Sequence, residues 1–301
     1  MKMKKLILLF AAAALLLAGC GGNEAQATPV PETETPTPAP TAAPEPERPP
    51  EGLPEGFAME DRTEEIRSRV AQAAEGVSMQ DEQDRVEALY REYSDYVGQA
   101  NTQTDANLLS QWPYLVWDTE LNSLWGRLKD ALSADVMEEL RNEEINWIRF
   151  RDEAAQEAVR SFEGGSIYPM LYTLEQAALT RNRACFLASM LSRAVNEPFE
   201  LPPRGVCGQY LDTGGTAAVY KRLVIAAGME SGYTATLFVS GTGTLEGEAE
   251  PAGEGKIAFT SYDGKVEGEI VYGWTGASFT VTRSDGGPFG LGEVYILPTA
   301  L

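Results

Sequence analysis

Histidine is absent from this chain of 301 residues, and basic side chains are scarce, at 24 against 45 acidic ones. Without histidine there can be no Ser-His-Asp triad, no Cys-His pair and no imidazole ligand for a metal. The formal net charge of −21 excludes the basic surface that nucleic-acid binding requires. We therefore expect a protein that is not an enzyme, with no catalytic residue, no cofactor and no nucleic-acid partner.

Cysteine is also rare, because only Cys20, Cys185 and Cys207 are present. Three thiols are too few for a thiolate zinc site or an iron–sulfur cluster, so we expect no metal. Cys185 and Cys207 lie 22 residues apart, and two alternatives stay open for them. They form a disulfide that joins the last helix to the first strand, or both are unpaired and Cys185 is buried among the helices.

The N-terminus has the pattern of an export signal. Three lysines within the first five residues precede an unbroken apolar run over 6–17, which is short for a membrane span. The run ends in Leu17-Ala18-Gly19-Cys20, which resembles the lipobox of bacterial lipoproteins. That resemblance implies a signal peptide over 1–19, a lipid on Cys20 and a position on the outer face of the cytoplasmic membrane. The alternative is a plain secretory signal with a chance cysteine.

Residues 20–57 have the composition of a tether rather than of a folded domain. Ten of the 18 prolines fall between Pro29 and Pro54, among many threonines and glutamates. Such a stretch favours the extended polyproline II conformation and cannot form a core. At ~3.1 Å per residue it reaches on the order of 100 Å, enough to hold a domain away from a membrane.

Apolar residues take up helical spacing over 58–200, where proline nearly vanishes. Leu121, Leu124 and Leu128 share one face of a predicted helix, and Pro113 kinks that helix or delays its start. Ser133 is a candidate N-cap for the helix that follows it. Helices are predicted over 60–74, 80–96 and 107–132, from 134 to the glycines at 164 and 165, and over 168–195. The expected product is an antiparallel bundle, and whether its first two helices join the core stays open.

Glycine becomes frequent in the last third of the chain, with 18 of the 29 glycines between Gly208 and Gly292. Apolar and polar residues alternate there between glycine-bearing turns, which predicts antiparallel strands. Eight strands are predicted, near 208–212, 217–226, 232–240, 244–250, 255–261, 265–272, 276–283 and 292–297. Eight up-and-down strands close into a small β-barrel or pack as a sandwich over 206–301. The expected fold class is therefore α+β with several domains, a helix bundle followed by a small antiparallel β domain.

Four short motifs follow one another at regular intervals in the helical part. In order they are an Asp-x-x-Leu-Asn helix, a Trp-Ile-x-Phe-Arg-Asp helix, a Gly-Gly-Ser turn and a Leu-Thr-x-x-Arg helix. Together they resemble the LprI-type lysozyme-inhibitor domain over about 105–193. The residues that carry this resemblance are Asp118, Asn122, Trp147, Phe150, Arg151, Asp152, Thr180 and Arg183.

The resemblance also separates structural residues from candidate contact residues. Trp147 and Phe150 are first interpreted as core residues, and Arg151 and Asp152 as partners in contacts between helices. The turn between the two long helices is the candidate contact loop, with a plain connecting turn as the alternative. Its residues are Glu163, Gly164, Gly165, Ser166 and Tyr168.

Three positions depart from the family pattern. Family members usually carry cysteines where this chain has Ala155 and Glu175, and glutamine where it has Glu144. A disulfide typically contributes about 2–4 kcal/mol, so we expect packing alone to hold this bundle together.

Two functional interpretations follow. The resemblance implies a membrane-anchored LprI-like module that binds and inhibits a cationic lysozyme, which an acidic surface would attract. The alternative is a non-catalytic lipoprotein of the cell envelope whose β domain binds a small or wall-derived ligand.

Overall fold

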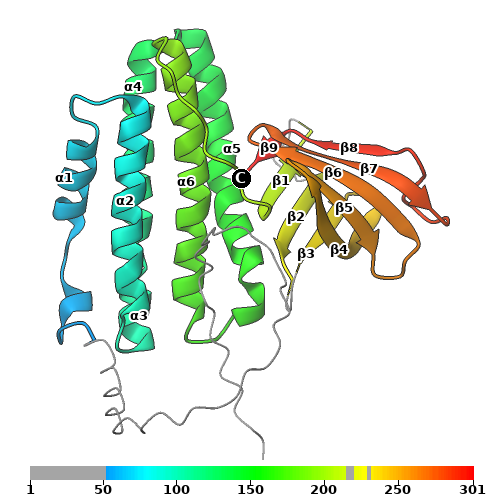
Figure 1. Cartoon of the computed structure of the whole chain (residues 1–301), viewed down its shortest axis with the longest axis horizontal. Helices are drawn as coiled ribbons and strands as arrows, with labels where there is room; N and C mark the ends of the chain where they lie inside the picture. The colour runs from blue at the N-terminus through cyan, green and yellow to red at the C-terminus, as the bar shows by residue number, and fades with distance from the viewer. Residues whose placement is uncertain (1–51, 215–219, 229–231) are drawn as a thin grey trace, which may run out of the picture. The chain divides into compact units, whose positions relative to one another are not determined.

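The computed structural model describes residues 52–214, 220–228 and 232–301 (Figure 1). The leader, Cys20 and the tether as far as residue 51 lie outside the described residues, as do residues 217–219 of the second predicted strand. Helices come first along the described chain and strands follow, so the expected α+β class is confirmed.

Consecutive long helices run up and down beside one another in the first part (Figure 1). One short 3-10 turn precedes them at 57–59, and another lies between the last two helices at 160–162. The α-helices of the described chain are α1 (Thr63–Ala73), α2 (Met79–Gly98), α3 (Gln103–Leu109), α4 (Gln111–Ala131), α5 (Ala134–Ala158) and α6 (Tyr168–Ala194). None of the helices in the described residues is both long and apolar enough to cross a membrane.

The predicted helix over 107–132 is divided in the structure, because α3 ends at Leu109 and α4 begins at Gln111. Pro113 lies in the first turn of α4, where a missing backbone N–H costs nothing, so it sets the late start of that helix. Ser133 does stand at the N-cap position of α5, with extended backbone, but its side chain makes no capping hydrogen bond. Ser78 caps the N-terminus of α2 by accepting a hydrogen bond from the N–H of Asp81, and Thr102 caps α3 by accepting one from the N–H of Asp105.

One apolar cluster fills the space between the helices. It includes Trp117, Leu124 and Leu128 of α4 as well as Ile66 of α1 and Val86 of α2, all 1% exposed or less. The first two helices therefore belong to the bundle core, which resolves the question that the sequence left open.

Nine antiparallel strands of the described chain form a nearly closed, barrel-like sheet, one strand more than predicted. The order across the sheet is β8-β7-β6-β5-β4-β3-β2-β1-β9, so each strand from β1 to β8 pairs with its neighbour in sequence. The added strand β9 pairs with β1 at the far edge. The strands are β1 (Gly208–Asp212), β2 (Lys221–Ala227), β3 (Tyr233–Val239), β4 (Gly243–Gly253), β5 (Lys256–Ser261), β6 (Val266–Gly273), β7 (Gly276–Ser284), β8 (Val294–Leu297) and β9 (Thr299–Ala300).

Aromatic side chains fill the interior of this sheet. The rings of Phe259 and Phe279 pack edge to face, with centroids 5.1 Å apart. Two glycines make room for them: a Cβ on Gly247 would lie 2.7 Å from the Phe259 ring, and one on Gly268 would lie 2.7 Å from the Phe279 ring. Side chains therefore occupy the space in which barrels of this kind hold a ligand.

The sheet contacts the helices through both apolar and polar groups. Leu211 of β1 and Leu301 are fully buried in the same apolar cluster as the helix core. Gln209 of β1 donates a hydrogen bond to the main-chain oxygen of Ala154 in α5 at 2.9 Å. Trp274, in the turn between β6 and β7, donates to the main-chain oxygen of Pro202 at 3.0 Å. The two folded parts thus share a packed boundary.

Candidate functional site

The motif residues lie on three helices that pack together: Asp118 and Asn122 on α4, residues 147–152 on α5, and Thr180 and Arg183 on α6. Trp147 and Phe150 point inward and are 2% and 1% exposed. The Thr180 hydroxyl donates to the main-chain oxygen of Gln176, one turn earlier in its own helix. These side chains contribute to the packing of the bundle.

Arg151 connects the polar motif residues across the bundle. It donates to Asp152 at 2.8 Å and to the hydroxyl of Tyr114 at 3.3 Å. Tyr114 donates in turn to Asp118 at 3.4 Å. From the other side, Gln176 of α6 donates to Asp152 at 3.0 Å. Three helices therefore meet in one hydrogen-bonded network, and burial raises the pKa of Tyr114 within it.

The candidate contact loop between α5 and α6 projects into solvent, and every residue from 160 to 166 is exposed. Gly164 has a φ of 79°, a conformation that glycine adopts without strain. The N–H of Gly165 donates to the main-chain oxygen of Phe162 at 2.9 Å. Asn107 of α3 donates to the main-chain oxygen of Ser166 at 3.0 Å. The loop is thus held in a defined shape although its side chains are exposed.

Two tyrosines connect this loop to the network around Arg151. The rings of Tyr168 and Tyr172 stack with centroids 6.0 Å apart and planes 13° apart. The Tyr172 hydroxyl accepts from Gln176 at 3.1 Å, and Gln176 also donates to Asp152. The Asp152 side chain remains 47% exposed, so the network reaches the surface beside the loop.

Phe162 is a candidate contact residue that the sequence analysis missed. It lies directly before Glu163 and is 41% exposed, which is unusual for a phenylalanine. An aromatic residue directly before a glycine turn was the available signal. Exposed aromatic residues are frequent centres of protein–protein contacts.

Cys185 and Cys207 are both free in the structure, as the unpaired alternative has them. Cys185 of α6 is 2% exposed and faces α2, with its sulfur 4.0 Å from Oε1 of Gln83. Cys207 is exposed just before β1. Burial raises the pKa of Cys185 to about 11, which makes its thiol unreactive at neutral pH.

The positions that depart from the family pattern occupy different environments. Ala155 is fully buried, whereas Glu175 is half-buried and burial raises the pKa of its carboxyl. Glu144 is 6% exposed and accepts a hydrogen bond from Arg183 at 2.8 Å. The replacement of the usual glutamine therefore places an ion pair inside the bundle.

Comparison with known proteins shows which family the chain resembles. A family model described as lysozyme inhibitor LprI matches residues 94–187, which include α3 to α5 and most of α6. An uncharacterized protein of Rhizobium meliloti is 30% identical over 110 residues, which cover 32% of this chain and 79% of that protein. No solved structure matches.

Proposed function

This chain belongs to the LprI family of lysozyme inhibitors, and we propose on that premise that it binds and inhibits a cationic lysozyme outside the cytoplasm. The exposed loop at 160–166 carries the proposal. It combines an exposed aromatic ring, a free carboxylate and a backbone that hydrogen bonds hold in shape. A pre-shaped loop binds more tightly than a mobile one, because less conformational entropy is lost on binding.

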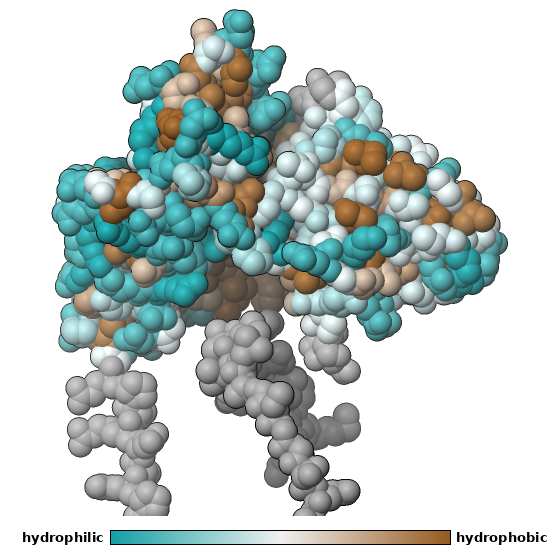
Figure 2. All heavy atoms as spheres, turned by 45° about the horizontal axis from the view of Figure 1, so that its top comes forward, coloured by the Kyte–Doolittle hydropathy of each residue, from teal (hydrophilic) through white to brown (hydrophobic). Residues whose placement is uncertain are grey.

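Charge supports the same partner. The chain has a net charge of −21, and hydrophilic side chains cover most of the helical face seen in Figure 2. Glu163 adds a carboxylate in the loop, and Asp152 adds a partly exposed one on α5. A strongly basic enzyme would be steered toward this surface, and the steering would weaken with salt.

In this proposal the leader and Cys20 determine where the protein is located in the cell. Cleavage before Cys20 and lipidation of its thiol would fix the chain to the outer face of the cytoplasmic membrane, with the tether as a spacer. Expression of the full gene with Cys20→Ser would release protein that the wild-type sequence retains in the membrane fraction. Equal retention of both would refute the lipid attachment.

Lysis of cell-wall substrate at low salt tests the inhibition, using the full chain in mild detergent. Wild-type protein should slow lysozyme, and Phe162→Ala or Glu163→Lys should raise the inhibition constant by about tenfold or more. Glu254→Lys makes the same charge change on an exposed turn of the β domain and is the matched control. No inhibition by the wild type, or equal loss with the control variant, would reject the loop as the site.

A further inference from the structure

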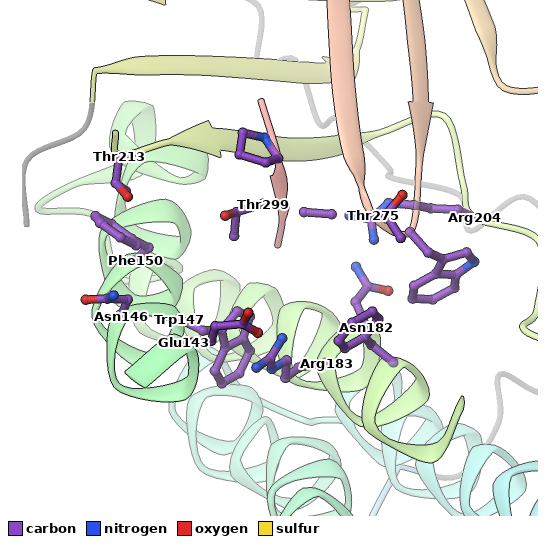
Figure 3. Close-up of a pocket in the computed structure, with 14 residues that line it drawn as sticks. Glu143, Asn146, Trp147, Phe150, Asn182, Arg183, Arg204, Thr213, Thr275 and Thr299 are labelled. Atoms are coloured by element: carbon purple, nitrogen blue, oxygen red, sulfur yellow. The ribbon is translucent and has the colours of Figure 1, made fainter. Parts of the chain in front are cut away.

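A concave site lies between the helices and the sheet, apart from the exposed loop. Its volume is about 390 Å³, within the range of small-molecule sites. Helices α5 and α6 form one wall (Figure 3). The opposite wall comes from Arg204, the β6–β7 turn and the segment around β9. Family-motif residues Trp147, Phe150 and Arg183 line it, so the family domain and the β domain share this cavity.

Two charged residues, Glu143 of α5 and Arg183 of α6, line the helix wall, and Arg183 carries the positive charge. Its Nε donates to Glu144, and the guanidinium lies 5.8 Å from the Trp147 ring and 5.3 Å from the Phe186 ring. The side chain is 9% exposed and lines the cavity, whereas Glu144 does not. Within the described residues, neither Nη2 of Arg183 nor the indole N–H of Trp147 has a hydrogen-bond partner. Both atoms are closed off from solvent, so it is the remaining surface of the Arg183 guanidinium that lines the cavity.

The sheet wall presents aromatic and hydroxyl groups. Arg204 lies 5.2 Å from the ring of Trp274 and donates to the main-chain oxygen of Leu301. Figure 3 shows Thr275 and Thr299 on this side, opposite Asn182 and Arg183 of the helix wall. Trp274 is held in place by its hydrogen bond to Pro202. The cavity thus offers indole and phenyl groups beside amide and hydroxyl groups.

From this arrangement we infer that the cavity binds a small sugar that carries a carboxylate. The carboxylate accepts from the guanidinium of Arg183, which lines the cavity, because arginine and carboxylate form the stronger, charge-assisted class of hydrogen bond. Trp274 supplies apolar surface for a sugar ring, and Asn182, Thr275 and Thr299 supply partners for its hydroxyls. The ligand contacts both folded parts at once and stabilises their boundary.

Matched pairs of sugars test this inference, with ligand-observed NMR titrations of the full chain in mild detergent. N-Acetylmuramic acid and N-acetylglucosamine differ by one carboxylate-bearing ether, and glucuronic acid and glucose differ by one carboxylate. The acid of at least one pair should bind about tenfold or more tightly than its neutral partner. Binding by only one of the two acids would identify which position of the carboxylate the site accepts.

Two variants and a control locate the binding. Arg183→Gln removes the donor, and Thr275→Glu places a negative charge at the exposed rim without disturbing the buried ion pair. Each should lower the affinity for the acid sugar by about tenfold or more. Thr244→Glu, at an exposed position of β4, should leave that affinity unchanged. Equal affinity for acid and neutral sugars, no binding of either acid at millimolar concentration, or insensitivity to Thr275→Glu would overturn the inference.

Discussion

Arg183 donates a hydrogen bond from Nε to Oε2 of Glu144 across 2.8 Å, and this ion pair joins α6 to α5 in the interior. Both side chains are 9% exposed, so neither charge is well solvated. Breaking one half of a buried pair leaves the other charge without compensation. The pair is therefore a strong constraint on the arrangement of the two helices even if its net contribution to stability is small.

The first prediction concerns this pair. Arg183→Met should lower the free energy of unfolding by about 3–5 kcal/mol, because Glu144 stays behind as a buried charge. The double variant with Glu144→Leu should recover most of that loss, since two apolar side chains replace two charges. Urea unfolding followed by circular dichroism measures both. A double variant as unstable as the single one would show that the two residues are not coupled.

The second prediction concerns Gly247 in the packed sheet interior. A Cβ at this position would lie 2.1 Å from the main-chain oxygen of Thr260 and 2.7 Å from the Phe259 ring. Gly247→Ala should therefore destabilise the sheet by about 1–3 kcal/mol through overpacking. Gly273→Ala is the control, because nothing lies within 4 Å of the added methyl group. Equal melting temperatures for the two variants would contradict the packing described here.

Much of the helical part could be predicted from the sequence because periodicity is a local signal. Leu124 and Leu128 repeat at helical spacing and are buried as expected. Pro113 indicated a kink or a late start of the helix, but α3 was not predicted as a separate helix because helix-forming residues flank Ser110 on both sides. Strand β9 was missed because two residues are too few to show alternation.

Of the two candidate sites, the loop could be predicted from local sequence and the cavity could not. The glycines at 164 and 165 predict a turn from composition alone, and a turn is present there. The cavity depends on Arg183 and Trp274, which are distant in sequence and meet through the packing of helices against the sheet. No local pattern contains that information.

The third prediction concerns the two cysteines. Iodoacetamide should alkylate Cys207 in the native protein at near-neutral pH and leave Cys185 largely unmodified, because burial raises the Cys185 pKa to about 11. Both should react once the chain is unfolded in urea. Peptide mass spectrometry without reduction resolves the two sites. A peptide in which they are joined by a disulfide would refute the free state.

A buried acidic cluster between α2 and α4 is the basis of the fourth prediction. Glu120 is fully buried and Glu82 is 2% exposed. Arg127 donates to Glu82 at 2.9 Å, and Gln83 donates to Glu120 at 2.5 Å. Burial, followed by the neighbouring charge of Glu82, raises the pKa of Glu120 from 4.5 to about 8. Glu120 is therefore protonated in the folded protein at neutral pH.

Between its unfolded and folded pKa values, the folded chain binds one proton more than the unfolded chain at Glu120. The stability that this proton contributes is full below about pH 4.5 and is lost as the pH rises through about 8. Within that window the free energy of unfolding of the wild type falls by up to about 1.4 kcal/mol per pH unit because of Glu120.

Glu120→Gln imitates the protonated acid and should remove this loss. The stability of the variant relative to the wild type should therefore rise with pH. Urea unfolding of both proteins at about pH 5 and about pH 8 measures the difference. Parallel changes in the two proteins would show that Glu120 titrates normally, and a relative loss of stability in the variant at the higher pH would show that the sign is reversed.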